Sequence, residues 1–421
     1  MEYLVDISKL YFLPGLALKI FRLHFMPEGL NAIPSLDKNP DIFIRKGYLG
    51  GGVHLFKEHG KQIHYYDVNS LYPFAQCNAL PFQNLGWRKV IPDLNDFFGF
   101  CLAEINCPND MLKPMLPYTD KGKTIYPTGS WKGVYFSEEL KAVQKLGYSI
   151  KPIRGYEFSK AVLFKDYIDH FYNLKSNSTG PERYLAKLML NSLYGLFGRG
   201  HSAIKPYYVP TDNYVAAIGS QEIIAEISIN SKLSLLLIDT DKNSNIANKL
   251  RGEIEINSSD FNLPTKSNVA IAAAVTSYAR IHMIPLLMED SVLYSDTDSI
   301  FTTKPLPSHL IGPEFGKLKN ELNGLVIDEA YFLGHKQYGY KYRDTDGQRV
   351  SKSVWAGIPR DSLDFLNITH LAKGLVINKL AKDRFFRTLK DLKIDVKDIN
   401  MTVSRSVTSV NNRYTPPHVE G

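Results

Sequence analysis

Cysteine is scarce in this sequence, which contains three among 421 residues. Cys77, Cys101 and Cys107 lack the paired spacing of zinc ligands, and three are too few for a disulfide framework. The chain therefore suits a reducing compartment, and structural zinc is not expected.

The N-terminal region lacks a long apolar run. Its apolar stretch "LYFLPGLALKIF", at residues 10–21, is interrupted by Pro14, Gly15 and Lys19. The stretch is too short to cross a bilayer and does not have the form of a secretion signal. We therefore expect no membrane segment, no signal peptide and no membrane partner.

An excess of charge of one sign is missing from most of the chain. Residues 1–330 contain 34 basic and 34 acidic side chains, whereas residues 331–421 contain 16 Lys and Arg against 9 Asp and Glu. Attraction for a polyanion should therefore be concentrated in the C-terminal segment and at local sites. A solvated basic surface would explain the same numbers.

The overall composition, 44% hydrophobic and 22% charged, is that of a globular chain long enough for several core-bearing units. Residues 81–165 are rich in proline, glycine and aromatic residues with short strand patterns, which predicts an inserted α+β subdomain. Residues 207–263 form a second, polar insertion rich in Asn and Ser.

Two stretches place Asp at strand-like positions, from which this residue type is depleted. In "VLYSDTDSIFTT", residues 292–303, Asp296 and Asp298 flank Thr297, and in "YYDVNSLYP", residues 65–73, Asp67 ends a run of strand formers. A polar hairpin turn would explain an isolated D-x-D pattern. Carboxylates at a hairpin tip also suit a divalent cation such as Mg²⁺, and the hairpin stretch alone leaves both interpretations open.

A helix is predicted over residues 178–200, "STGPERYLAKLMLNSLYGLFGRG", with Pro181 in its first turn and Gly195 near its end. At about 3.6 residues per turn, Lys187, Asn191 and Tyr194 share one face. The apolar side chains expected on the other side are Leu185, Leu188, Met189 and Leu193. A second long helix is predicted over residues 268–289.

The stretches "DVNSLYP", "KLMLNSLYG" and "YSDTDS", in this order, resemble the three sequence motifs of the B family of DNA polymerases. The resemblance implies an α+β, right-hand polymerase fold with palm, fingers and thumb and two inserted subdomains. It also implies a DNA-directed DNA polymerase that uses two Mg²⁺ ions, with a DNA template, a primer and deoxynucleoside triphosphates as partners.

On this resemblance the chain divides into six parts. They are an exonuclease–palm junction and first palm segment at 1–80, a first inserted subdomain at 81–165, fingers at 166–199, a second inserted subdomain at 200–266, a second palm segment at 267–340, and a thumb-like basic tail at 341–421.

The resemblance also assigns roles at the catalytic centre. Asp67 and Asp298 become the principal ligands of both metal ions, and the Val68 carbonyl contributes to one of them. Asp296 is expected beside the primer end, as a weaker ligand. Lys187 would neutralise charge that develops on the triphosphate. A solvent-facing lysine is the alternative for Lys187, and a turn residue the alternative for Asp296.

Further residues are assigned to the incoming nucleotide. Tyr72, next to Leu71, would pack under the deoxyribose and exclude the 2′-hydroxyl of a ribonucleotide. Tyr194, supported by Asn191, would pack against the nascent base pair. Both tyrosines could instead be core aromatics.

The stretches "YLGG", "TSYAR" and "KQY" resemble DNA-handling elements of the protein-primed branch of the B family, found in small bacteriophages and linear mitochondrial plasmids. The DNA contacts implied are Tyr48, Gly50, Gly51, Thr276, Arg280, Lys336 and Tyr338. Glycines let a backbone approach phosphates closely, and the basic side chains can bind them directly. Each position could equally be a turn or a surface charge.

One feature departs from the family pattern. About sixty residues precede "YYDVNSLYP", and they contain no D-x-E pair, so we expect no proofreading exonuclease chemistry. The chain resembles a polymerase half, for which an inactive, plasmid-derived remnant that only binds DNA is the alternative. A reverse transcriptase fits less well, because its two carboxylates are adjacent, whereas Asp296 and Asp298 are not.

Two finer expectations follow from the resemblance to the protein-primed branch. The insertions lie where that branch holds a terminal protein and encircles DNA, which implies priming by a protein hydroxyl. The abundance of Asn, Ile, Lys and Tyr suggests AT-rich coding and a mitochondrial location. A phage origin would fit the same motifs.

Overall fold

A computed structural model describes residues 3, 5, 13–30, 32–120, 122–199, 204–210, 222–239, 267–388, 393–405 and 418–419. The chain forms two compact units. Unit 1 comprises Met1–Arg199, Lys266–Val376 and Ser404–Gly421, and unit 2 comprises Gly200–Thr265 and Ile377–Val403.

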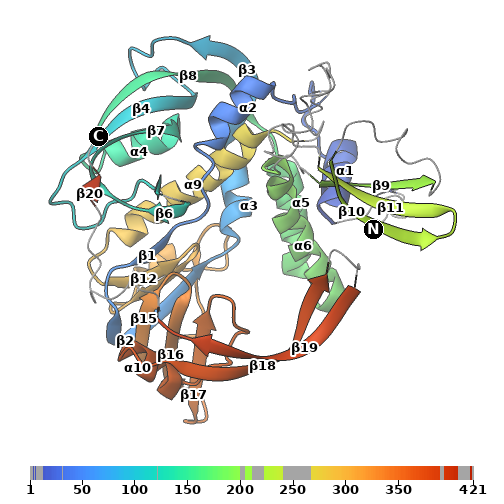
Figure 1. Ribbon diagram of the computed structural model, residues 1–421. Helices are drawn as coiled ribbons and strands as arrows, with labels where there is room; N and C mark the ends of the chain where they lie inside the picture. Colours follow the sequence, from blue (N-terminus) through green and yellow to red (C-terminus); the bar gives the residue numbers. More distant parts are fainter. Residues whose placement is uncertain are drawn as a thin grey trace. The chain divides into compact units, whose positions relative to one another are not determined.

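An eight-stranded antiparallel sheet forms the base of unit 1 (Figure 1). Its strands, in spatial order, are β1 (Val53–Leu55), β12 (Val292–Asp296), β13 (Ser299–Thr302), β2 (His59–Val68), β15 (Ile327–Gly334), β16 (Gln337–Arg343) and β17 (Arg349–Trp355), and β14 (Leu318–Asn320) also pairs with β2. Strand β2 therefore lies in the centre of the sheet. It is nevertheless an early strand, because only β1 precedes it in the sequence.

Both faces of this sheet are apolar. One face carries an aromatic cluster in which Tyr294 stacks on Phe332, with ring centroids 4.9 Å apart, and Phe301 stacks on Tyr65 at 4.2 Å. Tyr66 and Ile300 belong to the larger core formed with the helices. Strands that are buried on both faces have nearly continuous runs of hydrophobic residues. The few polar side chains at the ends of such strands are therefore conspicuous in the sequence.

The core of unit 1 is organised around α9 (Val269–Leu287). This helix packs against α2 (Lys38–Arg45), α3 (Leu71–Gln76), α4 (Ser137–Gln144) and α6 (Gly180–Phe197). It begins at Asn268, whose side chain accepts a hydrogen bond from the Ala270 N–H at 3.2 Å. Within the described residues it is the one helix long and apolar enough to cross a membrane, but it is mostly buried, as expected of a core helix.

A second sheet of unit 1 has five strands. Their order is β20 (His418–Val419), β7 (Thr128–Phe136), β4 (Gly99–Cys107), β8 (Ser149–Val162) and β3 (Ala79–Arg88). A small hairpin, β5 (Tyr118–Asp120) and β6 (Lys123–Ile125), accompanies it. In Figure 1, α9 lies between this sheet and the eight-stranded sheet.

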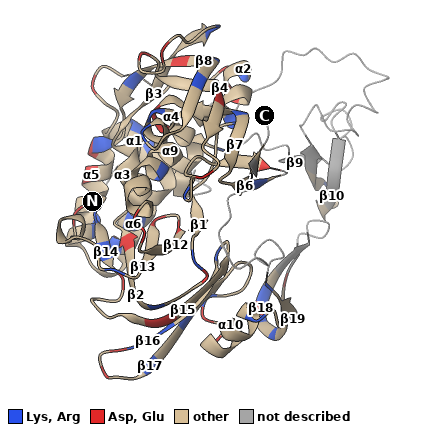
Figure 2. Ribbon diagram, turned by 90° about the vertical axis from the view of Figure 1, so that its left-hand side faces the viewer, with Lys and Arg blue, Asp and Glu red and all other residues tan. Residues whose placement is uncertain are grey.

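Two further helices complete the core. Helix α5 (Lys165–Asn177) packs against α6. Helix α1 (Leu13–His24), which lies far from α6 in the sequence, also packs against it. The short α10 (Phe365–Ala372) contacts β15, β16 and β17. Lys and Arg are interspersed with Asp and Glu over these elements (Figure 2).

Unit 2 contains two small antiparallel sheets. One has the order β10 (Glu222–Asn230), β11 (Leu233–Asp239) and β9 (Ile204–Pro210), and the other is the hairpin of β18 (Ile377–Thr388) and β19 (Lys393–Val403). The predicted insertion at 200–266 thus contains strands in its first part, while residues 240–266 lie outside the described residues.

The helices predicted over 178–200 and 268–289 are confirmed as α6 and α9. The apolar face of α6 differs in detail, because Leu185 is exposed and Ala186 and Leu190 are buried in its place. The predicted boundary between 340 and 341 falls within β16. Strand β17 and α10 belong to unit 1, and β18 and β19 belong to unit 2. The division into palm, fingers, thumb and insertions stays a prediction.

Candidate active site

The two carboxylates predicted to act together lie on neighbouring strands. In the pairing of β13 with β2, Ser299 lies opposite Asp67, and the Val68 N–H donates to the Asp298 carbonyl oxygen at 2.8 Å. Val68 itself is buried in the core. The register of two antiparallel strands therefore brings Asp67 and Asp298 to one place in the sheet.

The turn between Asp296 and Asp298 has an unusual backbone. Thr297 has φ of 66°, in the left-handed region that β-branched residues rarely adopt. Its N–H donates to the Gly52 carbonyl oxygen, and the Asp298 N–H donates to the Asp296 carbonyl oxygen, both at 2.8 Å. These contacts hold the strained turn and fix the directions of the carboxylates on either side of it.

Burial disfavours the charged form of both acids. Burial, together with the charges of Asp298 and Glu321, raises the pKa of Asp67 to about 8. Burial likewise raises the pKa of Asp298. Two half-buried carboxylates that repel one another would be stabilised by a cation between them.

These two acids fit a Mg²⁺ site that water and substrate complete better than a metal site built from protein ligands alone. Within the described part of the chain, no three His, Cys, Asp or Glu side chains gather into a metal-binding group. Magnesium is commonly bound through one or two carboxylates, with water and substrate phosphates completing its shell. Asp67 and Asp298, with a backbone carbonyl such as that of Val68, match this donor set.

The metal-free protein should lose stability as the pH rises from about 4 towards 8. The pKa of Asp67 is raised from its ordinary 3.8 to about 8, so the folded state binds more protons in this window and its stability falls. Urea unfolding in a chelator should show a smaller loss for Asp67→Asn. Equal losses in the variant and the wild type would contradict this prediction.

Asp296 already has a cationic partner. The Lys336 Nζ donates to Asp296 Oδ1, and Thr297 Oγ1 donates to the same atom at 3.2 Å. Lys336 occupies a left-handed position, with φ of 52°, between β15 and β16. An acid neutralised by lysine is a poorer metal ligand, in keeping with the weaker role that the sequence assigned to Asp296.

Cationic side chains of α5 and α6 lie near the carboxylates. Lys187 is exposed, and its charge lowers the pKa of Asp67. Lys175 donates to Ser70 Oγ at 3.0 Å, and Arg183 Nη1 donates to the Lys175 carbonyl oxygen at 2.5 Å. Burial lowers the pKa of Lys175, and the charges of Arg183 and Lys187 add to this effect.

Sequence reasoning missed Lys175 and Arg183. The four-residue spacing of Arg183 and Lys187 places both on one face of α6 and could have indicated Arg183. Lys175 lies on α5, and only the turn between the helices brings it to the same place. Three clustered cations form a site for a polyanionic group such as a triphosphate.

Two tyrosines form a stacked pair beside the acids. The rings of Tyr72, on α3, and Tyr194, on α6, have centroids 4.9 Å apart and an interplanar angle of 11°. Both are partly exposed, whereas the neighbouring Leu71 is buried. Asn191 is exposed one turn from Lys187 on α6. The two tyrosines pack against the core of unit 1 with part of each ring exposed, so their contact with a nucleotide stays a prediction.

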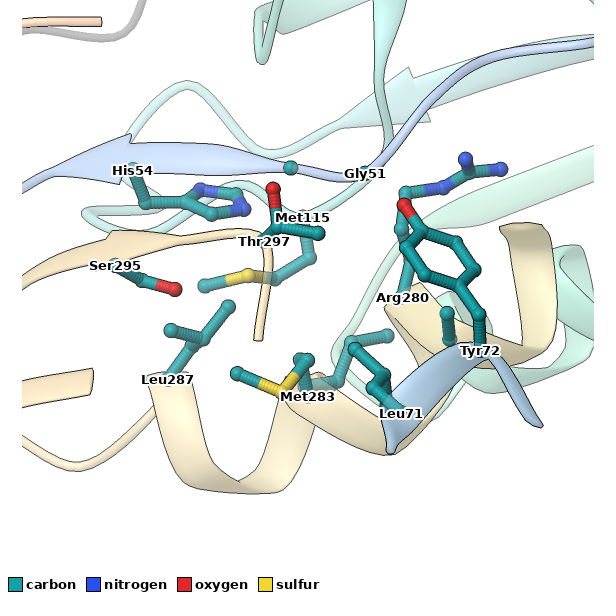
Figure 3. Close-up of a pocket in the computed structure, with 13 residues that line it drawn as sticks. Gly51, His54, Leu71, Tyr72, Met115, Arg280, Met283, Leu287, Ser295 and Thr297 are labelled. Carbon is teal, nitrogen blue, oxygen red and sulfur yellow. The ribbon is translucent and has the colours of Figure 1, made fainter. Parts of the chain in front are cut away.

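Arg280 is buried in this structure, and its predicted contact with DNA phosphates stays a prediction. Its guanidinium pairs with Glu139 of α4, with Nε–Oε1 at 2.5 Å and Nη2–Oε2 at 2.7 Å. Its Nη1 donates to the carbonyl oxygens of Leu49 and Gly50 at 2.7 and 2.6 Å. Arg280 thus holds the glycine loop, residues 49–52, in place. Figure 3 shows Arg280 and Gly51 among the residues that line one pocket.

Thr276 and Tyr338 are also buried, and their predicted contacts with DNA stay predictions. Thr276 is buried in α9 and donates to the Ala273 carbonyl oxygen, and Tyr338 packs in the aromatic cluster with 5% of its surface exposed. Burial raises the pKa of Tyr338 to about 12. Of the other predicted DNA contacts, Gly50 and Lys336 are exposed, while Tyr48 and Gly51 are partly buried.

A central antiparallel sheet, with Asp67 at the end of β2 and Asp298 in the adjoining β12–β13 turn, and a helix that carries Arg183 and Lys187 are the features expected of a right-hand nucleic acid polymerase fold. Residues 1–291 match the family described as DNA polymerase type B, organellar and viral. This match covers more than half of the chain, and the chain belongs to that family.

Similar proteins agree with this assignment. The chain is 31% identical over 467 residues to a probable DNA polymerase of Podospora anserina and 30% identical over 422 residues to one of Neurospora intermedia. These alignments cover 98% and 95% of the chain but 38% and 41% of the relatives, so the chain spans well under half of their length.

A solved structure shows the same fold. Phi29 DNA polymerase complexed with primer-template DNA and incoming nucleotide substrates aligns with a TM-score of 0.63 and 20% identity, over 89% of this chain and 64% of that one. The expectation of an α+β, right-hand polymerase fold is therefore confirmed.

Proposed function

We propose that the chain is the polymerase portion of a DNA-directed DNA polymerase, which adds deoxynucleoside triphosphates to a hydroxyl group under the direction of a template. The observation that carries this proposal is the pairing of β2 with β13, which brings Asp67 and Asp298 together. The names of the fungal relatives and the DNA-bound phi29 structure support it.

In this proposal Asp67 and Asp298, with the Val68 carbonyl, hold two Mg²⁺ ions. Bound Mg²⁺ would supply activation of the attacking hydroxyl and neutralisation of charge on the attacking and leaving oxygens. Lys187, Arg183 and Lys175 bind and orient the triphosphate and stabilise charge on its leaving part. Lys336 keeps Asp296 fixed beside the place of the primer end.

The stacked tyrosines position the other end of the nucleotide. Tyr194 offers its exposed edge to the nascent base pair, and Tyr72 supports the sugar from below. A phenol ring packed at this place leaves no room for a ribose 2′-hydroxyl, so the pair favours deoxyribonucleotides.

Magnesium-dependent primer extension by the purified chain tests this function. We expect template-directed extension that stops in a chelator and resumes on addition of Mg²⁺. A folded chain that retains a primer–template but never extends it would favour the alternative, an inactive remnant that only binds DNA.

Lys187→Ala should raise the KM for deoxynucleoside triphosphates and lower kcat, reducing kcat/KM by about tenfold to a hundredfold, the loss expected for one charged hydrogen bond. Steady-state extension kinetics measure the effect. Lys145→Ala, at an exposed position after α4, serves as the matched control. Unchanged kinetics in the Lys187 variant would remove this lysine from the nucleotide site.

We further propose that the natural primer is a hydroxyl of a terminal protein and that the element copied is a linear plasmid of mitochondria. The resemblance of "YLGG", "TSYAR" and "KQY" to the protein-primed branch and the two insertions support this. No additional catalytic residue is needed, because a Ser, Thr or Tyr hydroxyl replaces the primer hydroxyl.

Covalent transfer of a labelled deoxynucleotide to a candidate terminal protein tests the primer. An enzyme that extends DNA primers but never labels that protein would contradict protein priming. Fractionation of host cells tests the location, since the protein should be recovered with mitochondria.

A further inference from the structure

The glycine loop is held on both sides of Gly51. Before it, Arg280 Nη1 donates to the carbonyl oxygens of Leu49 and Gly50. After it, the Gly52 carbonyl oxygen accepts from the Thr297 N–H at 2.8 Å. Since Arg280 is itself buried against Glu139, the backbone at Gly51 has little freedom to move.

Gly51 touches two parts of the candidate site at once. A Cβ placed on this residue would lie 2.6 Å from the Tyr72 hydroxyl oxygen and 2.6 Å from Thr297 Cγ2. Both distances are far below an ordinary contact between such atoms, so a side chain here requires Tyr72 or Thr297 to shift. The Tyr72 hydroxyl therefore lies directly against the Gly51 backbone.

Tyr72 is therefore fixed at both ends of its side chain. Its ring stacks on Tyr194, and its hydroxyl lies against the glycine loop. Figure 3 shows Tyr72, Thr297 and Gly51 around the same pocket. The adjacent Gly50 has a different environment, because a Cβ there meets no atom within 4 Å.

We propose that Gly51 is a specificity-determining residue for the sugar of the incoming nucleotide, because it fixes the hydroxyl of Tyr72. The inference rests on the proposed function, in which Tyr72 packs under the deoxyribose. A Tyr72 ring that is held firmly at its hydroxyl excludes the 2′-hydroxyl of a ribonucleotide. A ring that a side chain at residue 51 has displaced admits the 2′-hydroxyl more easily.

The test measures the ratio of kcat/KM for a deoxynucleotide to that for the matching ribonucleotide, in single-nucleotide extension with Mg²⁺. Gly51→Ala should lower this ratio about fivefold to tenfold, because the added methyl group pushes the Tyr72 ring out of its preferred rotamer. Gly50→Ala should keep the wild-type ratio, whatever its effect on DNA affinity. Thermal unfolding of each variant shows whether it is folded.

A second variant keeps the test decisive if Gly51→Ala does not fold. Tyr72→Phe removes the hydroxyl that Gly51 fixes and should lower the ratio to a similar extent. In a folded double variant, Gly51→Ala should add less than twofold to the effect of Tyr72→Phe, because both act through the same hydroxyl.

The outcomes separate the two proposals. Wild-type protein that adds neither sugar overturns the proposed function and this inference with it. Wild-type protein that discriminates between the sugars, together with a folded Gly51→Ala or Tyr72→Phe variant whose ratio stays within twofold of wild type, overturns the role of Gly51 alone.

Discussion

Asp298→Asn is expected to reduce nucleotide addition by at least about a thousandfold while leaving the protein folded. An amide is a weak ligand for Mg²⁺, and the loss of several kcal/mol of transition-state stabilisation corresponds to this factor. Single-turnover extension of a primer by one nucleotide, with enzyme in excess, measures the chemical step directly.

The fold should tolerate this change, since burial already disfavours the charged form of Asp298. In a chelator, the variant should be at least as stable as the wild type, and its affinity for primer–template should change little. Asp96→Asn, an exposed acid before β4, is the matched control and should extend primers normally. Extension at near wild-type rates by folded Asp298→Asn would remove this residue from the catalytic centre.

Glu139→Gln is expected to destabilise the protein by about 3–5 kcal/mol, because it leaves the buried charge of Arg280 without its partner. The side chains of Arg280 and Glu139 are only 5% and 1% exposed. Burial lowers the pKa of Arg280, but Glu139 outweighs this effect and raises it overall. Chemical denaturation followed by circular dichroism measures the change.

An exposed ion pair provides the comparison. Glu104 pairs with Lys132 at 3.1 Å, with 39% of the Glu104 side chain exposed, so Glu104→Gln should have an effect of less than about 1 kcal/mol. If Glu139→Gln proved equally mild, the glycine loop would have to be held by contacts other than the Arg280 guanidinium.

The positions of the catalytic motifs could be predicted from the sequence, because strand and helix patterns around Asp67, Lys187 and Asp298 are strong. The local pattern of apolar residues and helix-end signals also predicted helices α6 and α9. Long-range pairing could not be predicted from residue patterns alone. The register that places Ser299 opposite Asp67 depends on side-chain packing across the sheet, and the family resemblance only implied that the acids meet.

The burial of Arg280 against Glu139 could not be predicted for the same reason. A basic residue on a helix is normally exposed, and the sequence contains no local sign that Glu139, far away in the chain, lies opposite it. Lys175 was missed for a related reason, since it joins Lys187 only through the turn between α5 and α6. The hydrophobic periodicity of the sequence does not reveal residues that only the tertiary structure brings together.

The central place of β2 has a consequence for how the chain folds during synthesis. Its three partners, β13, β14 and β15, all follow residue 298 in the sequence. Until the ribosome has made them, β2 has no strand with which to form these hydrogen bonds, and its unpaired edges invite association with other chains. Pairings across such long separations form slowly. We therefore expect nascent chains that end before β13 to depend on chaperones.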